Sequence, residues 1–388
     1  MIRLGTLELR RIGLPLVTPF RTSFGTETTR DILLVHVTGT DLDTGATVDG
    51  WGENVAGVEP RYSYEFVDAS QLATAEHLWP ALVAGGPLTA ADVAHRLEPF
   101  KGFAMAKAAL EAAVLDAELR AAGTNLHAHF GAVSDTVASG VSVGIFDDLD
   151  TLLTQVQGYV DDGYARIKIK IEPGWDVEPT RLVRELIGPE MGLQVDANTA
   201  YTRADAAHLA QLDEYDLLLI EQPLPEDDLL GHAALARALA TPVCLDETIT
   251  SLTIAEDAID CGAAEVINIK AGRVGGYLTA RRIHDLCLAR GVPVWCGGML
   301  ETGIGRAANA ALATLPGFTL PGDISASTRF YARDIVTHPI VVDAGRVAVP
   351  TAHGLGFDLD TDFLESVTRS TVTLAATGAG VGDGVGDD

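Results

Sequence analysis

Cysteine is scarce in this sequence. The 388 residues include four, Cys244, Cys261, Cys287 and Cys296, and their spacing matches no metal-ligand motif. Cys244 and Cys296 also lie inside apolar, strand-like runs. Four buried thiols in a chain of this length fit a reducing compartment better than a disulfide framework, so we expect a cytoplasmic protein.

Long apolar runs are missing as well. No stretch approaches the roughly 18–20 consecutive apolar residues that a membrane-spanning helix needs. The first eight residues lack the basic segment and the apolar stretch of a signal peptide. We therefore expect no membrane partner and no targeting segment.

Positive charge is in short supply. Lys and Arg number 27 against 54 Asp and Glu, which leaves a formal net charge of −27. A body this acidic repels phosphate backbones, so we expect no nucleic-acid partner. It also repels anionic small molecules at long range, so a carboxylate ligand would need a local cationic site.

The composition that remains is that of a globular protein, with 47% hydrophobic and 21% charged residues. The length suggests two or three domains. Residues 1–130 mix a β-branched run at 32–38 with one long helical pattern at 103–123, which is typical of an α+β domain. Gly123 would end that helix.

A regular alternation follows in residues 131–322. Seven strand-like runs are separated by helical spacing at 204–212, 229–240 and 277–290, with a repeat of roughly 25 residues. Such βαβα alternation favours a parallel sheet covered by helices, either a barrel or, as the competing fold, a doubly wound open sheet. The seven runs are 141–145, 167–171, 193–198, 217–223, 243–247, 266–270 and 292–297.

Irregular strand signals return after the repeats. Residues 335–337 and 340–343 are apolar and β-branched, and we expect the segment 323–377 to return to the first domain. Residues 378–388 are rich in Gly and acidic residues, which predicts a disordered tail.

Charged residues close five consecutive strand-like runs, and this is the most informative pattern in the chain. They are separated by 26, 25, 25 and 24 residues and comprise Lys170, Asp196, Glu221, Asp246 and Lys270. In a parallel barrel all strands end at one rim, where such barrels place their active sites. Counted from 141–145, the acids end strands three to five, and the lysines end strands two and six, across a diameter.

Each residue alone has a plainer interpretation. A single acid at a strand end is more often a helix cap, and a Lys-x-Lys pair such as Lys168 and Lys170 is more often a solvated face. All five, placed at near-constant spacing after runs that otherwise exclude charge, favour a shared site instead.

Three converging carboxylates need a counter-charge, and their oxygens suit a hard divalent cation such as Mg²⁺. We therefore expect Asp196, Glu221 and Asp246 to be metal ligands. The cation and the two ammonium groups would stabilise the charge that appears when a proton is removed next to a carboxylate.

These residues resemble the enolase superfamily, and in particular its muconate-lactonizing-enzyme subgroup, which has Lys-x-Lys on the second strand and Lys on the sixth. The seventh strand here, at 294–299, lacks the His of the mandelate-racemase-like and sugar-acid-dehydratase branches. Finer motifs are similar to the o-succinylbenzoate synthase / N-acylamino acid racemase family: Pro19–Gly25, Lys168–Trp175, Asp196–Asn198, Asn268–Gly276, Gly297–Arg306 and Leu320–Ser325. The likeness covers nearly the whole chain except the tail.

The resemblance implies a fold and a set of roles. The fold is a (β/α)7β modified TIM barrel with an α+β capping domain built from residues 1–130 and 323–377. Lys170 would abstract the α-proton, Lys270 would stay cationic or return a proton to the opposite face, and Lys168 would support them. Asn198 and Glu247 would also support the site, although Asn198 could equally be a turn residue or a helix cap.

The resemblance also implies substrate contacts. The loop 18–28 would close over the site, with Gly25 as a hinge or a plain turn residue. An arginine at position 273 is associated in this family with N-succinylamino acid racemisation, although it could be a loop charge. The expected substrate-binding residues are Phe20, Phe24, Ser142, Asn198, Arg273, Gly298 and Met299.

The leading function is then o-succinylbenzoate synthase, a lyase of menaquinone biosynthesis that uses Mg²⁺ or Mn²⁺, with accompanying racemase activity. The alternatives are a dedicated N-acylamino acid racemase, a muconate-type cycloisomerase and a non-catalytic carboxylate-binding barrel. Dipeptide epimerases carry Asp-x-Asp near the eighth strand, where this chain has Asp323 and Ser325, which argues against that activity. The expected partners are a small-molecule carboxylate and, by analogy, further copies of the chain.

Overall fold

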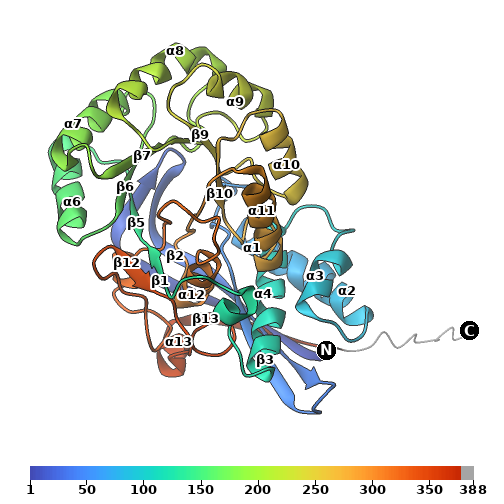
Figure 1. The fold of residues 1–388 in the computed structure, drawn as a ribbon. Helices are drawn as coiled ribbons and strands as arrows, with labels where there is room; N and C mark the ends of the chain where they lie inside the picture. Colours follow the sequence, from blue (N-terminus) through green and yellow to red (C-terminus); the bar gives the residue numbers. More distant parts are fainter. Residues whose placement is uncertain (377–388) are drawn as a thin grey trace, which may run out of the picture.

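The computed structural model describes residues 1–376 and contains three sheets. A four-stranded antiparallel sheet has the order β13-β1-β2-β3, and a seven-stranded parallel sheet runs consecutively from β5 to β11. A third, two-stranded sheet pairs β4 with β12. In Figure 1 the helices α6 to α11 form an arc outside the parallel strands, with the antiparallel sheet below.

The antiparallel sheet is built from both ends of the chain. Its strands are β1 (Ile2–Thr22), β2 (Gly25–Asp41), β3 (Thr47–Asn54) and β13 (Thr368–Ala375). β13 pairs with β1, with Leu7 opposite Leu374, so the C-terminal segment does return to the N-terminal sheet. Where one folding unit ends and the next begins along the chain stays a prediction.

Helix α4 (Ala104–Ala121) packs closely on this sheet and realises the helix expected at 103–123. It is buried on most of its sides, and not only on the face that the apolar spacing indicates. Gly52 of β3 makes the close approach possible, because a Cβ atom there would lie 2.0 Å from the Ala109 carbonyl oxygen. The smaller elements of this region are α1 (Val67–Ala73), the π-helical turn η1 (Thr74–Leu78), α2 (Trp79–Ala84), α3 (Ala90–Arg96) and α5 (Leu126–Phe130).

All seven strand-like runs contain parallel strands. They are β5 (Gly140–Val143), β6 (Arg166–Lys170), β7 (Gly192–Asp196), β8 (Ile220–Glu221), β9 (Val243–Leu245), β10 (Val266–Ile269) and β11 (Val294–Cys296). Their consecutive order has no switch point, which excludes the doubly wound alternative. Isolated bridges from Phe318 to Val294 and from Gly322 to Ser139 link the two edges of the sheet and close the barrel in place of a regular eighth strand.

The barrel helices follow the expected pattern with one exception. They are α6 (Leu149–Asp161), α7 (Val177–Ile187), α8 (Ala206–Leu209), α9 (Leu229–Ala236), α10 (Leu252–Asp260), α11 (Tyr277–Arg290) and α12 (Gly303–Leu312). The single helix expected at 204–212 is wrong, because α8 is one short turn between the 3₁₀ turns η2 (Arg203–Asp205) and η3 (Ala210–Tyr215). Leu209 and Leu212 are both buried, and their spacing of three matches the 3₁₀ repeat.

The strands expected at 335–337 and 340–343 do not form. Only isolated bridges occur there, and Pro339, which lacks a backbone N–H, separates the two runs. The segment contains instead η4 (Ser327–Arg329), β12 (Arg346–Ala348) paired with β4 (Thr136–Ala138), and α13 (Thr361–Val367). The tail expected at 378–388 lies outside the described residues.

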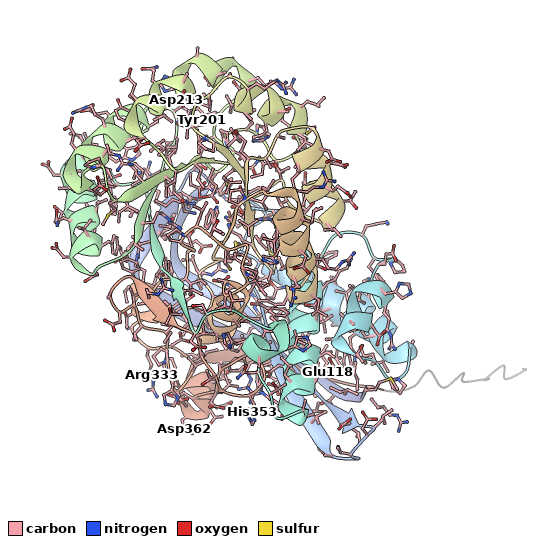
Figure 2. All side chains as sticks on the ribbon, in the orientation of Figure 1. Glu118, Tyr201, Asp213, Arg333, His353 and Asp362 are labelled. Atoms are coloured by element: carbon pink, nitrogen blue, oxygen red, sulfur yellow. The ribbon has the colours of Figure 1, made fainter. Side chains whose placement is uncertain are left out.

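Side chains fill the space enclosed by the strands, as in other barrels of this kind (Figure 2). In the same view Tyr201 and Asp213 lie on the helical arc, whereas Arg333 and Asp362 lie at the opposite end of the molecule, near α13. None of the described helices is both long and apolar enough to cross a bilayer.

One buried acid joins the two parts of the fold. Glu111 of α4 accepts a hydrogen bond from the Leu278 backbone N–H at the start of α11, at 3.1 Å. Gly276 makes room for it, since a Cβ there would lie 2.3 Å from the carboxylate. Burial raises the pKa of Glu111 to about 8, although the backbone N–H groups oppose the shift.

This raised pKa predicts a dependence of stability on pH. Because folded Glu111 holds its proton more tightly than the unfolded chain does, its contribution is present at low pH and is lost as the pH rises toward about 8. We expect Glu111→Gln to flatten the fall in unfolding free energy between pH 5 and pH 8 by up to about 1.4 kcal/mol per pH unit. Denaturant titrations of both proteins would measure this, and parallel profiles would contradict it.

Candidate active site

Five of the predicted site residues meet at one rim of the barrel. Lys170, Asp196 and Glu221 close β6, β7 and β8 and are paired side by side in the sheet register. Asp246 and Lys270 directly follow β9 and β10. All five are at most 7% exposed, so the shared rim expected from the spacing is present.

Each lysine is paired with acids. Lys170 Nζ lies 2.5 Å from Asp196 Oδ2, and Lys270 Nζ lies 2.7 Å from Asp246 Oδ2. The two lysines therefore approach the acids from the two ends of the arc, as their strand positions require.

Lys168 lies between the acids and a residue that the spacing did not indicate. Its Nζ is 2.9 Å from Glu221, 3.2 Å from Asp196 and 2.7 Å from Asp323. Asp323 also pairs with Arg166, at 2.9 Å. Burial disfavours a charged Lys168, yet Asp323 and Glu221 outweigh it and raise its pKa, which favours the charged form of Lys168 at the site.

The acids affect one another strongly. Burial raises the pKa of Glu221 to about 8, and the negative charges of Asp196 and Asp246 add to the shift. Burial would also raise the pKa of Asp246, but Arg273 and Lys270 outweigh it and hold that pKa well below its usual range. The neighbouring cations thus outweigh burial and the repulsion among the acids at Asp246 but not at Glu221.

The rim can be tested for its fit to a divalent cation. Among residues 1–376, no three His, Cys, Asp or Glu side chains stand as a ready-made metal cage. The donors nevertheless suit one: three buried carboxylates shift one another's pKa values, and two further oxygens, Glu247 Oε2 and Asn268 Oδ1, are buried without a hydrogen-bond partner. An all-oxygen set of carboxylates and an amide is what Mg²⁺ prefers.

Asn198 and Glu247 form a supporting layer. Asn198 Oδ1 accepts a hydrogen bond from Lys170 Nζ at 2.7 Å, and its Nδ2 donates to Glu247 Oε1 at 2.9 Å. Asn198 and the following Thr199 have positive φ angles of 42° and 64°. A β-branched residue in this region is a genuine outlier, which is typical of backbone held in place at a functional site.

Arg273 does not line the cavity, where the resemblance would place a substrate contact. It is 3% exposed, and its Nη1 pairs with Asp246 and also donates to Tyr62 Oη at 2.7 Å. Its two other nitrogens donate to the carbonyls of Ile249 and Asn268. Arg273 therefore pairs with Asp246 and helps to keep the pKa of this acid low.

The cavity at the rim has an inner and an outer part. The inner part, about 60 Å³, is lined by Lys170 and Lys270 together with Phe20, Ser142, Gly298 and Phe330. The outer part, about 510 Å³, adds Phe24, Asn198, Tyr62 and Met299. The predicted substrate-contact residues other than Arg273 therefore surround one space, and the lysines lie at its inner end.

Several residues at the rim escaped the sequence analysis. Tyr62 Oη accepts from Lys270 Nζ at 3.1 Å, and Asn268 Nδ2 donates to Glu221 at 2.7 Å. Asn268 could have been found, because it lies two positions before Lys270 and so points to the same side of the strand. Tyr62 comes from an irregular loop of the N-terminal region and has no signal in the sequence.

Known proteins resemble this chain over most of its length. Residues 7–131 match the family model described as "Mandelate racemase / muconate lactonizing enzyme, N-terminal domain", and residues 151–363 match "Enolase C-terminal domain-like". A protein named N-succinylamino acid racemase, from an Amycolatopsis species, is 56% identical, with 97% of this chain and 100% of that protein covered. One named o-succinylbenzoate synthase, from Geobacillus kaustophilus, is 47% identical, with 93% and 95% covered.

Solved structures agree with these matches. An enolase superfamily member from Listeria innocua superposes with a TM-score of 0.91 at 39% identity, covering 97% of this chain and 100% of its own. A muconate lactonizing enzyme from Pseudomonas fluorescens, complexed with muconolactone, shares the fold with a TM-score of 0.87 at 24% identity, covering 95% and 100%. With both family models matched in order and relatives covered almost end to end, the chain belongs to the mandelate racemase / muconate lactonizing enzyme family of the enolase superfamily.

Proposed function

We propose that this chain removes the proton α to a carboxylate, and that its reactions are o-succinylbenzoate synthesis and N-succinylamino acid racemisation. The observation that carries the proposal is the placement of Lys170 and Lys270 in one small cavity, on the second and sixth strands, with three acids on the strands between. The relatives that carry these two names are 56% and 47% identical to the chain, which supports both activities.

The two lysines would divide the work. Lys170 Nζ takes the α-proton, held for this by Asn198 Oδ1. In the synthase reaction the β-hydroxyl then leaves from the same face as water, taking up the proton that Lys170 had removed, while Lys270 stays protonated and stabilises the negative intermediate. In racemisation Lys270 Nζ gives a proton to the opposite face of the same carbon. Only the fate of the deprotonated substrate differs, so one site serves both reactions.

Asp196, Glu221 and Asp246 would hold Mg²⁺, and Mn²⁺ would substitute for it. When bound, the ion supplies positive charge beside the substrate carboxylate and compensates the acids that otherwise attract the lysine protons. Lys168, which pairs with Asp196, Glu221 and Asp323, would offset part of the negative charge of these acids.

The walls of the cavity would select the substrate. Phe20, Phe24 and Met299 offer apolar surface, while the Ser142 hydroxyl is buried without a partner and is available to a polar group. Ser325 stands where dipeptide epimerases carry their second Asp, and the first, Asp323, is engaged by Lys168 and Arg166. A dipeptide amine therefore has no free pair of acids to bind.

The two reactions can be tested side by side. We expect the purified protein to form o-succinylbenzoate from its cyclohexadiene precursor and to racemise N-succinyl-phenylglycine, as followed by ultraviolet absorbance and by polarimetry. Racemisation without synthesis would identify a dedicated racemase. Failure of both would overturn the substrate assignment, and absence of α-proton exchange with any carboxylate would favour a binding barrel.

Removing either lysine should show which enantiomer of the substrate each lysine deprotonates. We expect Lys170→Ala and Lys270→Ala each to lower racemisation by roughly 10²–10⁴-fold, the usual contribution of a general base or acid. Each variant should still exchange the α-proton of the one enantiomer that the remaining lysine reaches, as measured by proton NMR in D₂O. Lys101→Ala, on an exposed lysine, is the matched control, and equal loss of exchange for both enantiomers would contradict the assignment.

Metal removal gives an independent test. We expect chelation to abolish activity, and Mg²⁺ or Mn²⁺ to restore it and to raise the melting temperature through binding to the folded state. Asp246→Asn should weaken this stabilisation by metal, whereas Asp257→Asn, at an exposed acid of α10, should not. Full activity after exhaustive chelation would refute the metal-dependent mechanism.

A further inference from the structure

The tip of the β1–β2 hairpin rests on the rim of the barrel. The Arg21 carbonyl accepts a hydrogen bond from Ile145 N at 3.0 Å, and its guanidinium pairs with Glu172 at 3.3 Å. Ser23 Oγ donates to the Asn198 carbonyl at 3.0 Å. These partners lie in the segments that follow β5, β6 and β7, so the hairpin from the N-terminal sheet bridges three successive strand ends.

The Ser23 contact falls on a residue that makes several hydrogen bonds within the site. Asn198 accepts from Lys170 Nζ, its backbone N–H donates to Asp196 Oδ1 at 3.1 Å, and its Nδ2 donates to Glu247. A shift of Asn198 would therefore move the partner of the lysine and disturb two acids together.

The backbone of Asn198 needs external support. Its φ of 42° and the 64° of Thr199 place two successive residues in the left-handed region, which persists only where the surroundings hold it. Thr199 N donates to the Gln222 carbonyl at 2.8 Å. Within residues 1–376 the Asn198 carbonyl has one protein donor, the Ser23 hydroxyl.

The turn itself does not need this hydroxyl. Thr22 Oγ1 already accepts the Phe24 backbone N–H at 3.2 Å, and Thr22 pairs with Gly25 across the hairpin. The Ser23 side chain takes no part in these bonds and instead reaches the barrel. If Ser23 were only a turn residue, its hydrogen bond to Asn198 would have no function.

We infer that Ser23 is a positioning residue, which fixes Asn198 and through it Lys170 only when the hairpin lies on the rim. The inference rests on the proposed function, because it assigns Lys170 the α-proton. Docking of the hairpin, whose Phe20 and Phe24 line the cavity, is then coupled to the orientation of the base. Ser23 itself does not line the cavity and touches no substrate.

The effect of Ser23 should be one-sided. Lys270 is held by Asp246 and Tyr62, and neither of these contacts Ser23. Loss of the hydroxyl should therefore impair the step that belongs to Lys170 and spare the step that belongs to Lys270. A hairpin that merely closed the cavity would serve both enantiomers equally.

The test compares Ser23→Ala with the wild-type protein in D₂O, with N-succinyl-phenylglycine as substrate. Lys170→Ala and Lys270→Ala first identify the enantiomer that each lysine deprotonates. We expect Ser23→Ala to slow α-proton exchange of the Lys170 enantiomer by roughly three- to tenfold, the effect of one neutral hydrogen bond, and that of the other by less than about twofold. Ser23→Thr, which keeps a hydroxyl, should restore the rate, and Thr18→Ala, at an exposed residue of the same hairpin, should leave it unchanged.

A second measurement does not depend on activity. Arg21 lies two residues before Ser23, so its peptide bond should become more accessible when the hairpin is released. In the metal-free protein we expect trypsin to cut Ser23→Ala after Arg21 at least about threefold faster than the wild type. Thr18→Ala should be cut at the wild-type rate. Equal loss of exchange for both enantiomers, no loss, or unchanged cleavage would each overturn the positioning role. If the wild-type protein exchanges neither enantiomer, the proposed function fails, and the positioning role fails with it. The cleavage rates would then report only on the hydrogen bond between Ser23 and Asn198.

Discussion

Three lysines and three acids share the rim of one barrel with almost no exposure to solvent. Lys168, Lys170 and Lys270 are 2%, 7% and 7% exposed, and Asp196, Glu221 and Asp246 are at most 1% exposed. Buried charges persist only when they are paired and hydrogen-bonded, so the position of each ammonium group is tied to that of a carboxylate. This mutual constraint keeps two amines on either side of one small cavity.

The rest of the fold maintains this rim. The antiparallel sheet, made of both chain ends, carries the hairpin that covers the cavity, and α4 joins that sheet to the barrel through Glu111 at the start of α11. Tyr62, from the same N-terminal region, reaches Lys270. The barrel thus supplies the charged groups, and the capping sheet supplies the residues that cover and orient them.

On the proposed function, the same geometry would serve both of the activities for which the relatives are named. Synthase and racemase begin with loss of one α-proton, and they differ only in whether a leaving group departs or a proton returns. A lysine that remains charged serves the first outcome, and a lysine that gives up its proton serves the second. On the same proposal, substrate selection would depend on the apolar walls formed by Phe20, Phe24 and Met299, which line the cavity.

The sequence by itself determined the barrel and its five charged strand ends. A βα unit has a fixed length, and parallel strands end on one side, so near-constant spacing was enough to bring Lys170, Asp196, Glu221, Asp246 and Lys270 together. Only the tertiary structure decided which lysine pairs with which acid, that Arg273 stands behind Asp246, and that Tyr62, Asp323 and Ser23 reach the rim. Tyr62, Asp323 and Ser23 lie in loops that are far in the sequence from the five strand ends. The position of such a loop depends on packing between segments and not on a local repeat. For the same reason the strands expected at 335–337 and 340–343 were wrong: local apolar content favoured them, but no neighbouring edge pairs with that stretch beyond isolated bridges.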